Sequence, residues 1–182
     1  KKPIIACIEG HAIGMGCALA LACDVRLAHI KTVPWKIGLN EVRYGLIPPP
    51  WVTAALGYTI GYRPAEKLIQ TGALVTPTHA HSIGLLDVLV DSNPIEKSLA
   101  HMHRMLSVPQ HGRHTAKSML RRELLSTLMT DDDRTHDITF FQKYRRAHAY
   151  REALQSYLAE MDEKTQLLPS ELQEDSWDPK ST

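Results

Sequence analysis

The sequence lacks any apolar run that approaches the roughly 20 residues a helix needs to cross a bilayer. It also lacks an excess of charge of either sign: 21 Lys and Arg residues stand against 20 Asp and Glu residues, for a formal net charge of +1. A balanced chain gives no electrostatic reason to expect nucleic acid or an anionic membrane as the main partner. We therefore expect neither a nucleic-acid nor a membrane partner.

Cysteine is scarce, and its three residues are Cys7, Cys17 and Cys23. An odd number on apolar elements is not a disulfide framework and indicates buried thiols in a reducing compartment. Among the ten histidines, His111 and His114 could share a helix face, but no cysteine or acidic partner completes a metal site there. His79 and His81 are two positions apart, so on a helix they point in different directions. We expect no metal and no other cofactor.

The 182 residues are enough for one domain with a hydrophobic core. Short β-branched and apolar runs predict strands at 3–9, 24–28 and 85–90. The all-apolar run after the second glycine of the Gly-Met-Gly turn predicts a fully buried helix at 17–23. Periodicity, prolines and glycines predict further helices from residue 51 and at 63–70, 77–82, 94–106, 111–130 and 131–164.

Glu41 is a single acidic residue between two apolar runs, in the stretch IGLNEVRYGLIPPPW. A carboxylate in such surroundings is partly desolvated, which raises its pKa and makes it a better base. The alternative is a structural carboxylate in a loop, paired with a nearby arginine such as Arg43.

The turn Gly14-Met15-Gly16 comes directly before the predicted buried helix. The first N–H groups of a helix have no partner inside it, and the positive end of the helix dipole lies there. Such a helix start can stabilise a developing negative charge. The alternative is an ordinary strand-turn-helix connection. Neither common nucleotide-binding loop fits, because a third glycine and a Gly-Lys-Ser/Thr are missing.

Three motifs together carry a resemblance to a known family: P-x-I-A-x-I-x-G, G-x-G-C-x-L-A-x-x-C-D and I-G-L-N-E-x-x-x-G-x-I. They resemble the crotonase (enoyl-CoA hydratase/isomerase) superfamily, and within it the mitochondrial-type Δ3,Δ2-enoyl-CoA isomerases. The resemblance implies an α/β fold with a ββα spiral core. The core would occupy residues 1–91, a helical region for packing and trimerisation residues 92–166, and a flexible tail residues 167–182.

The resemblance also implies that strand-helix repeats of the fold precede residue 1, so that the N-terminal part of the fold lies outside this chain. It suggests a homotrimer or a dimer of trimers, and a mitochondrial matrix location. Residues 179–182 do not match a peroxisomal S-K-L address.

For the site, the resemblance implies an acyl-CoA thioester as substrate, Glu41 as the catalytic base and the backbone N–H of Met15 as one of two oxyanion-hole donors. The second donor would lie upstream of Lys1. The other positions assigned to substrate binding are Gly14, Gly16, Ala18, Leu46 and Trp51.

The implied reaction converts a 3-enoyl-CoA into a trans-2-enoyl-CoA in fatty-acid β-oxidation. Hydratases of the family carry a second Glu where this chain has Ala18, which favours isomerisation over water addition. Two alternatives stay open: another crotonase activity, such as acyl-CoA hydrolysis or weak hydration, and a non-catalytic assembly role.

Overall fold

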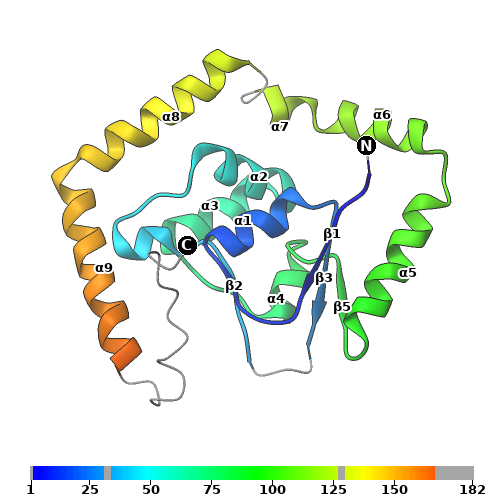
Figure 1. Ribbon diagram of the computed structural model, residues 1–182, viewed down its shortest axis with the longest axis horizontal. Helices are drawn as coiled ribbons and strands as arrows, with labels where there is room; N and C mark the ends of the chain where they lie inside the picture. Colours follow the sequence, from blue (N-terminus) through cyan, green and yellow to red (C-terminus); the bar gives the residue numbers. More distant parts are fainter. Residues whose placement is uncertain (1, 31–33, 127–129, 167–182) are drawn as a thin grey trace, which may run out of the picture.

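A computed structural model describes residues 2–30, 34–126 and 130–166, and places helices around a small parallel sheet (Figure 1). The strands are β1 (Ile5–Ile8), β2 (Ala12–Ile13), β3 (Val25–His29), β4 (Ile37–Gly38) and β5 (Val88–Val90). The helices of the first half are α1 (Met15–Ala22), the 3₁₀ turn η1 (Glu41–Tyr44), α2 (Pro50–Ile60), α3 (Tyr62–Thr71) and α4 (Pro77–Ser82). They are followed by α5 (Pro94–Leu106), α6 (Gln110–Leu120), α7 (Arg122–Ser126), α8 (Asp131–Arg146) and α9 (His148–Gln166).

All described strand ladders are parallel. One sheet has the order β1-β3-β5, with Ile5 opposite Val25 and Leu27 opposite Val88. A second pairing joins β2 to β4. Parallel neighbours need a crossover connection, and α1 provides it between β1 and β3. The α/β class is confirmed.

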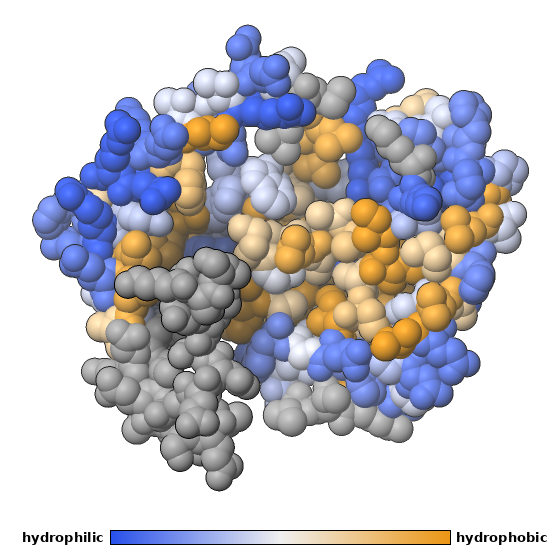
Figure 2. Space-filling view, viewed as in Figure 1, coloured by the Kyte–Doolittle hydropathy of each residue, from blue (hydrophilic) through white to orange (hydrophobic). Residues whose placement is uncertain are grey.

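Two expectations about burial are wrong. One face of α1 is buried, including Cys17 and Leu21, but Met15 is 57% and Leu19 66% exposed. The helix is apolar all round, yet among the described residues only one of its faces packs against the core. Figure 2 shows apolar surface over the middle of this view, where α1 lies in Figure 1. The thiol-bearing residue Cys7 on β1 is exposed rather than buried, because its side chain projects from a face of the sheet that the described residues leave uncovered at this position.

Most predicted helix starts in the first half are confirmed. Thr76 caps α4 by accepting a hydrogen bond from the His79 N–H, and Pro50 occupies the first turn of α2. The strand predicted at 85–90 is shorter in the structure. It is β5, which begins at Val88, so residues 85–87 lie outside it. Two long helices predicted at 111–130 and 131–164 are each broken, the first at Arg121 and the second at Ala147. Residues 127–129 and 167–182 lie outside the described residues.

The outer helices α5 to α9 follow one another in an arc around the sheet and α1 to α4 (Figure 1). The break between α8 and α9 lets both helices reach the same part of the core, since Tyr144 of α8 and Tyr157 of α9 each contact the η1 region. A role for residues 92–166 in oligomerisation stays a prediction.

No helix among the described residues has the length and apolar character that a membrane crossing requires.

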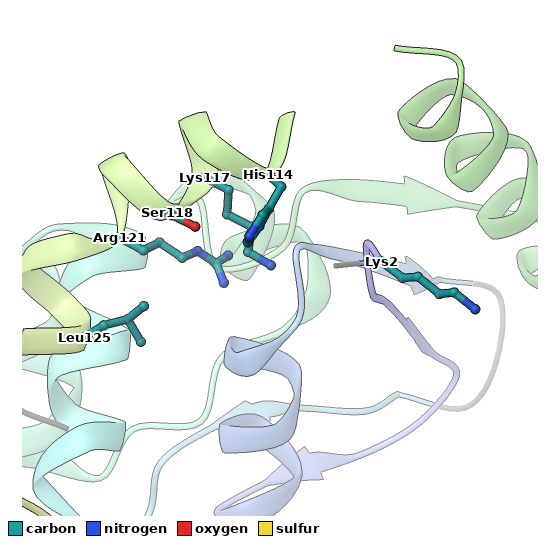
Figure 3. A pocket seen from close by; sticks show the side chains of 6 residues that line it. All are labelled: Lys2, His114, Lys117, Ser118, Arg121 and Leu125. Atoms are coloured by element: carbon teal, nitrogen blue, oxygen red, sulfur yellow. The ribbon is translucent and has the colours of Figure 1, made fainter. Parts of the chain in front are cut away.

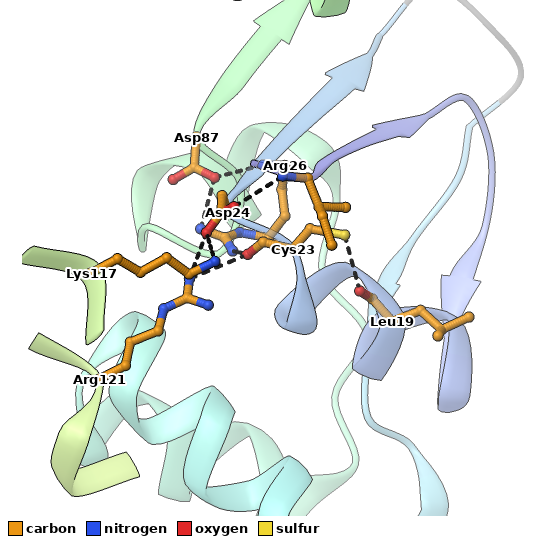
Figure 4. Close-up of polar contacts among 8 residues, drawn as sticks. Leu19, Cys23, Asp24, Arg26, Asp87, Lys117 and Arg121 are labelled. Carbon is orange, nitrogen blue, oxygen red and sulfur yellow. Dashed lines mark hydrogen bonds and ion pairs between the residues drawn. The ribbon is translucent and has the colours of Figure 1, made fainter. Parts of the chain in front are cut away.

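An ion-pair network fastens α6 to the sheet (Figure 4). Asp24, just before β3, accepts a hydrogen bond from the Ile4 N–H at 2.9 Å and pairs with Lys117 and Arg121. Beside it, the Arg26 guanidinium lies 2.7 Å from Asp87. The network therefore joins the N-terminal segment, the start of β3 and α6, which gives Asp24 a structural role.

Breaking this network is expected to destabilise the protein. The Asp24 side chain is 7% exposed, so Asp24→Asn leaves two cations without a counter-charge, which costs about 3 kcal/mol, the lower end for a buried pair. For a chain of this size the melting temperature falls by roughly 6 to 12 °C. Calorimetry checks this, with Asp131→Asn as the control, because Asp131 pairs with Arg134 on an exposed helix face where ion pairs contribute little. Equal melting temperatures for the two variants would contradict the anchoring role.

The same network predicts the effect of acid on stability. Burial by itself raises the pKa of the Asp24 carboxyl, but the hydrogen bonds from Lys117 and Ile4, with the charges of Lys117 and Arg121, outweigh it and leave the pKa below its ordinary value. A carboxyl with a lowered folded-state pKa stabilises the fold above its unfolded pKa of about 3.9. The contribution is therefore lost as the pH falls below about 4, and chemical denaturation of the wild type and Asp24→Asn at several pH values should show their difference shrinking there.

Candidate active site

The pairing of β2 with β4 brings the Gly14 turn and Glu41 together. Ile13 ends β2 opposite Gly38, which ends β4. The Gly14 N–H then donates to the Gly38 carbonyl at 2.9 Å. Because parallel strands end at the same edge of a sheet, the segments that follow them, α1 and η1, start side by side. Two stretches separated by more than twenty residues in sequence thus form one site.

The Glu41 carboxylate lies over Gly14. A Cβ placed on Gly14 would lie 3.5 Å from Glu41 Oε1, so the carboxylate is next to the space that a side chain at this position would fill. Gly14 has φ 58° and ψ −117°, a conformation that residues with a side chain rarely adopt. Met15, the next residue, begins α1. The carboxylate is therefore adjacent to the helix start whose N–H groups lack carbonyl partners inside the helix.

The environment of Glu41 is that of a partly desolvated base, because the residue is half-buried. Its Oε2 atom is buried and has no hydrogen-bond partner among the described residues. Burial raises the pKa of the Glu41 carboxyl, and a hydrogen bond from its own backbone N–H opposes the rise without cancelling it. The alternative pairing with Arg43 is wrong, because the Arg43 Nε donates instead to the Thr71 carbonyl at the end of α3.

The thiol of Cys17 is a neighbour of Glu41 that the sequence did not reveal. Cys17 is fully buried in the first turns of α1. Burial, and secondarily the charge of Glu41, raise the pKa of the Cys17 thiol to about 12. The thiol is thus neutral and adds no competing charge beside the carboxylate. No sequence signal pairs these two residues, because their proximity depends on the register of β2 against β4.

The remaining predicted site residues differ in exposure and in whether a hydrogen bond links them to Glu41. Gly16 is exposed in the first turn of α1, whereas Ala18, one residue after Cys17, is buried. The Leu46 N–H donates to the Glu41 carbonyl at 3.1 Å. Trp51, in the first turn of α2, packs against the hydrophobic core. Substrate contacts of these residues stay predictions.

A basic cavity lies elsewhere, between α6, α7 and the N-terminal segment (Figure 3). Its volume is about 150 Å³, and it is lined by Lys2, His114, Lys117, Ser118, Arg121 and Leu125. Two of its cations, Lys117 and Arg121, already pair with Asp24, and Lys2 extends away from the others in Figure 3. The cavity therefore belongs to the network that anchors α6 and is separate from the Glu41 site.

The chain is similar to known proteins. The family model described as "Enoyl-CoA hydratase/isomerase" matches residues 1–166. Human mitochondrial enoyl-CoA delta isomerase 1 is 32% identical over 162 residues, which are 88% of this chain and 53% of that protein. The human peroxisomal bifunctional enzyme is 35% identical over 113 residues, 62% of this chain and 15% of that protein.

The fold is also shared with a solved structure. The crystal structure of human mitochondrial delta3-delta2-enoyl-CoA isomerase superposes with a TM-score of 0.81 at 32% identity, covering 88% of this chain and 61% of that one. The chain spans about half the length of the mitochondrial isomerases that it matches. The match over residues 1–166 and the shared fold show that this chain belongs to the enoyl-CoA hydratase/isomerase family, the crotonase superfamily.

Proposed function

We propose that the protein isomerises 3-enoyl-CoA to trans-2-enoyl-CoA by a 1,3-proton shift, as a step of fatty-acid β-oxidation. One observation carries the proposal: the desolvated carboxylate of Glu41 lies against Gly14, beside the open N-terminus of α1. A base and an oxyanion-stabilising helix start are the two groups that proton abstraction next to a thioester carbonyl needs.

In the proposed reaction the Met15 N–H donates to the thioester oxygen. Glu41 removes a proton from C2, and the electron pair of the broken C–H bond moves toward that oxygen as a dienolate forms. The Glu41 carboxyl then delivers the proton to C4, so the double bond moves from C3–C4 to C2–C3. Atoms and charge balance, and the base is regenerated.

Ala18 favours isomerisation over hydration. It is buried directly after Cys17, at the position where the family resemblance places a second glutamate in hydratases. A methyl group can neither donate nor accept a proton, so water lacks a second activating acid. The family name covers both activities, and weak hydration or thioester hydrolysis is the second candidate.

Product analysis tests the proposal. The protein is incubated separately with a 3-enoyl-CoA and with a trans-2-enoyl-CoA, and the acyl-CoA species are separated by chromatography and identified by mass and reference compounds. We expect trans-2-enoyl-CoA to accumulate from the first substrate. Efficient formation of 3-hydroxyacyl-CoA from the second, or release of free CoA, would favour the second candidate.

The raised pKa of Glu41 predicts the pH dependence of turnover. The base acts as a carboxylate, so activity falls as the pH drops through its pKa. Because burial raises that pKa, the acidic limb of the kcat/KM profile is expected above the ordinary glutamate value of about 4.3. A limb at or below that value would show that the free enzyme's base is not desolvated.

We extend the proposal to the setting of the reaction. The mitochondrial names of several relatives support a mitochondrial matrix location, although a peroxisomal relative also matches. The family resemblance supports a homotrimer or a dimer of trimers. The proton shift itself requires no metal or other cofactor, and acyl-CoA is the partner that the site would bind.

A further inference from the structure

A short 3₁₀ turn, η1, carries Glu41 at its first position. η1 has four residues, none of them fully buried. Its backbone hydrogen bonds include those from Arg43 to Asn40, from Gly45 to Val42 and Glu41, and from Leu46 to Glu41. An isolated 3₁₀ turn of this length is weak, because its hydrogen-bond geometry is poor and one bond fixes several dihedral angles. Contacts from outside the turn must therefore fix its position.

The helices α8 and α9 supply such contacts directly after Glu41. The Tyr144 hydroxyl of α8 donates to the Gly45 carbonyl at 2.6 Å, across 99 positions of sequence. The Tyr44 and Tyr157 rings lie with their centroids 4.4 Å apart. A Cβ on Gly45, whose φ is 64°, would come within 2.7 Å of the Ala153 side chain. The end of η1 is thus in close contact with both helices.

The opposite side of η1 is tied to α3. The Arg43 Nε donates to the Thr71 carbonyl, and its Cγ lies against Gly72. Both this contact and the Tyr144 hydrogen bond are exposed, but at 3.4 Å the Arg43 contact is much longer than the 2.6 Å bond from Tyr144 and is the weaker restraint. Of these two hydrogen bonds from neighbouring helices to the residues 43–45, the one donated by the Tyr144 hydroxyl is therefore the stronger.

We propose that Tyr144 is a positioning residue for the Glu41 base: its hydrogen bond to Gly45 holds η1 so that the carboxylate stays over Gly14. This rests on the proposed function and gives it a specific support in the C-terminal helices, which were expected to serve packing and oligomerisation. Without the hydroxyl, the Gly45 carbonyl accepts a hydrogen bond from water instead, and η1 is held less firmly. The Glu41 carboxylate then moves away from its position over Gly14. A displacement of about 1 Å in a reacting group can lower a rate by roughly 10²-fold.

The test compares Tyr144→Phe with Tyr150→Phe in the full chain. Both substitutions remove one hydroxyl from the same pair of edge-to-face rings, whose centroids lie 5.4 Å apart, and the Tyr150 hydroxyl makes no hydrogen bond to described residues. Two quantities are measured: kcat and KM for 3-enoyl-CoA, and the Glu41 pKa by carbon NMR of side-chain-labelled glutamate, with Glu41→Gln assigning the signal. The Cys17 thiol, the titratable neighbour of Glu41 on α1, has a pKa of about 12 and does not titrate in the carboxyl range.

We expect Tyr144→Phe to lower kcat roughly tenfold, less than the roughly 10²-fold of a full displacement of about 1 Å, with little change in KM. We also expect it to lower the Glu41 pKa toward its ordinary value as water reaches the carboxylate. Tyr150→Phe should match the wild type in both. An unchanged kcat or an unchanged Glu41 pKa in folded Tyr144→Phe overturns the inference, as does an equal loss in Tyr150→Phe. If the wild type shows no isomerase turnover, the proposed function fails, and the Glu41 pKa alone then decides whether Tyr144 positions this carboxylate.

Discussion

Glu41→Gln is expected to lower isomerase turnover by at least about 100-fold, because a positioned general base contributes roughly 10²–10⁴ in rate. The amide keeps the size of the side chain and its hydrogen-bonding capacity, so the oxyanion site and the fold should persist. The buried Oε2 has no partner among the described residues, and a neutral amide is desolvated at lower cost than a carboxylate. The variant should therefore be at least as stable as the wild type. Steady-state kinetics and thermal denaturation measure the two effects.

Glu96→Gln is the matched control for this variant. Glu96 is an exposed carboxylate in the first turn of α5, so its neutralisation changes the charge of the protein by the same amount without touching the site. Turnover close to the wild type is expected there. If Glu41→Gln retained the activity of Glu96→Gln, another group would have to be the base.

Met15→Pro is expected to lower turnover by roughly 10²–10³-fold, the effect of losing one oxyanion-hole donor. Proline removes the backbone N–H and nothing else that the reaction uses. Met15 is the first residue of α1, the helical position where proline is best tolerated, since its N–H has no partner inside the helix. The loss should fall on kcat, because the donor acts on charge that develops in the transition state. Kinetics of the purified variant, with circular dichroism to confirm the helix, provide the measurement.

Met15→Ala separates the N–H from the side chain. The Met15 side chain is exposed, so its truncation keeps the donor and should leave turnover within a few-fold of the wild type. Equal losses in the alanine and proline variants would show that the side chain matters and the amide does not.

Much of the fold could be predicted because local chemistry decides it. The proline of α4, its Thr76 cap and the apolar run of β3 each specify an element within a few residues. The motif around Glu41 also predicted a desolvated carboxylate from its apolar neighbours. These features depend on residues adjacent in sequence, which is the information a sequence displays directly.

Other features depend on contacts between distant segments. The place of Cys17 beside Glu41 follows from the β2–β4 register. The bond from Tyr144 to Gly45 spans 99 positions, and the break between α8 and α9 at Ala147 lies inside a helical pattern that continues through it in the sequence. The exposed face of α1 was missed for a related reason: an apolar pattern shows which residues can be buried and does not show what covers them.

Deuterium transfer tests the central claim most directly, that one carboxylate carries hydrogen from C2 to C4. The substrate is a 3-enoyl-CoA with deuterium at C2, converted in ordinary water, and the first product formed is examined by NMR and mass spectrometry. With a base sheltered as Glu41 is, part of the product should carry deuterium at C4. If every molecule of early product held a solvent hydrogen at C4, the single sheltered base would be contradicted.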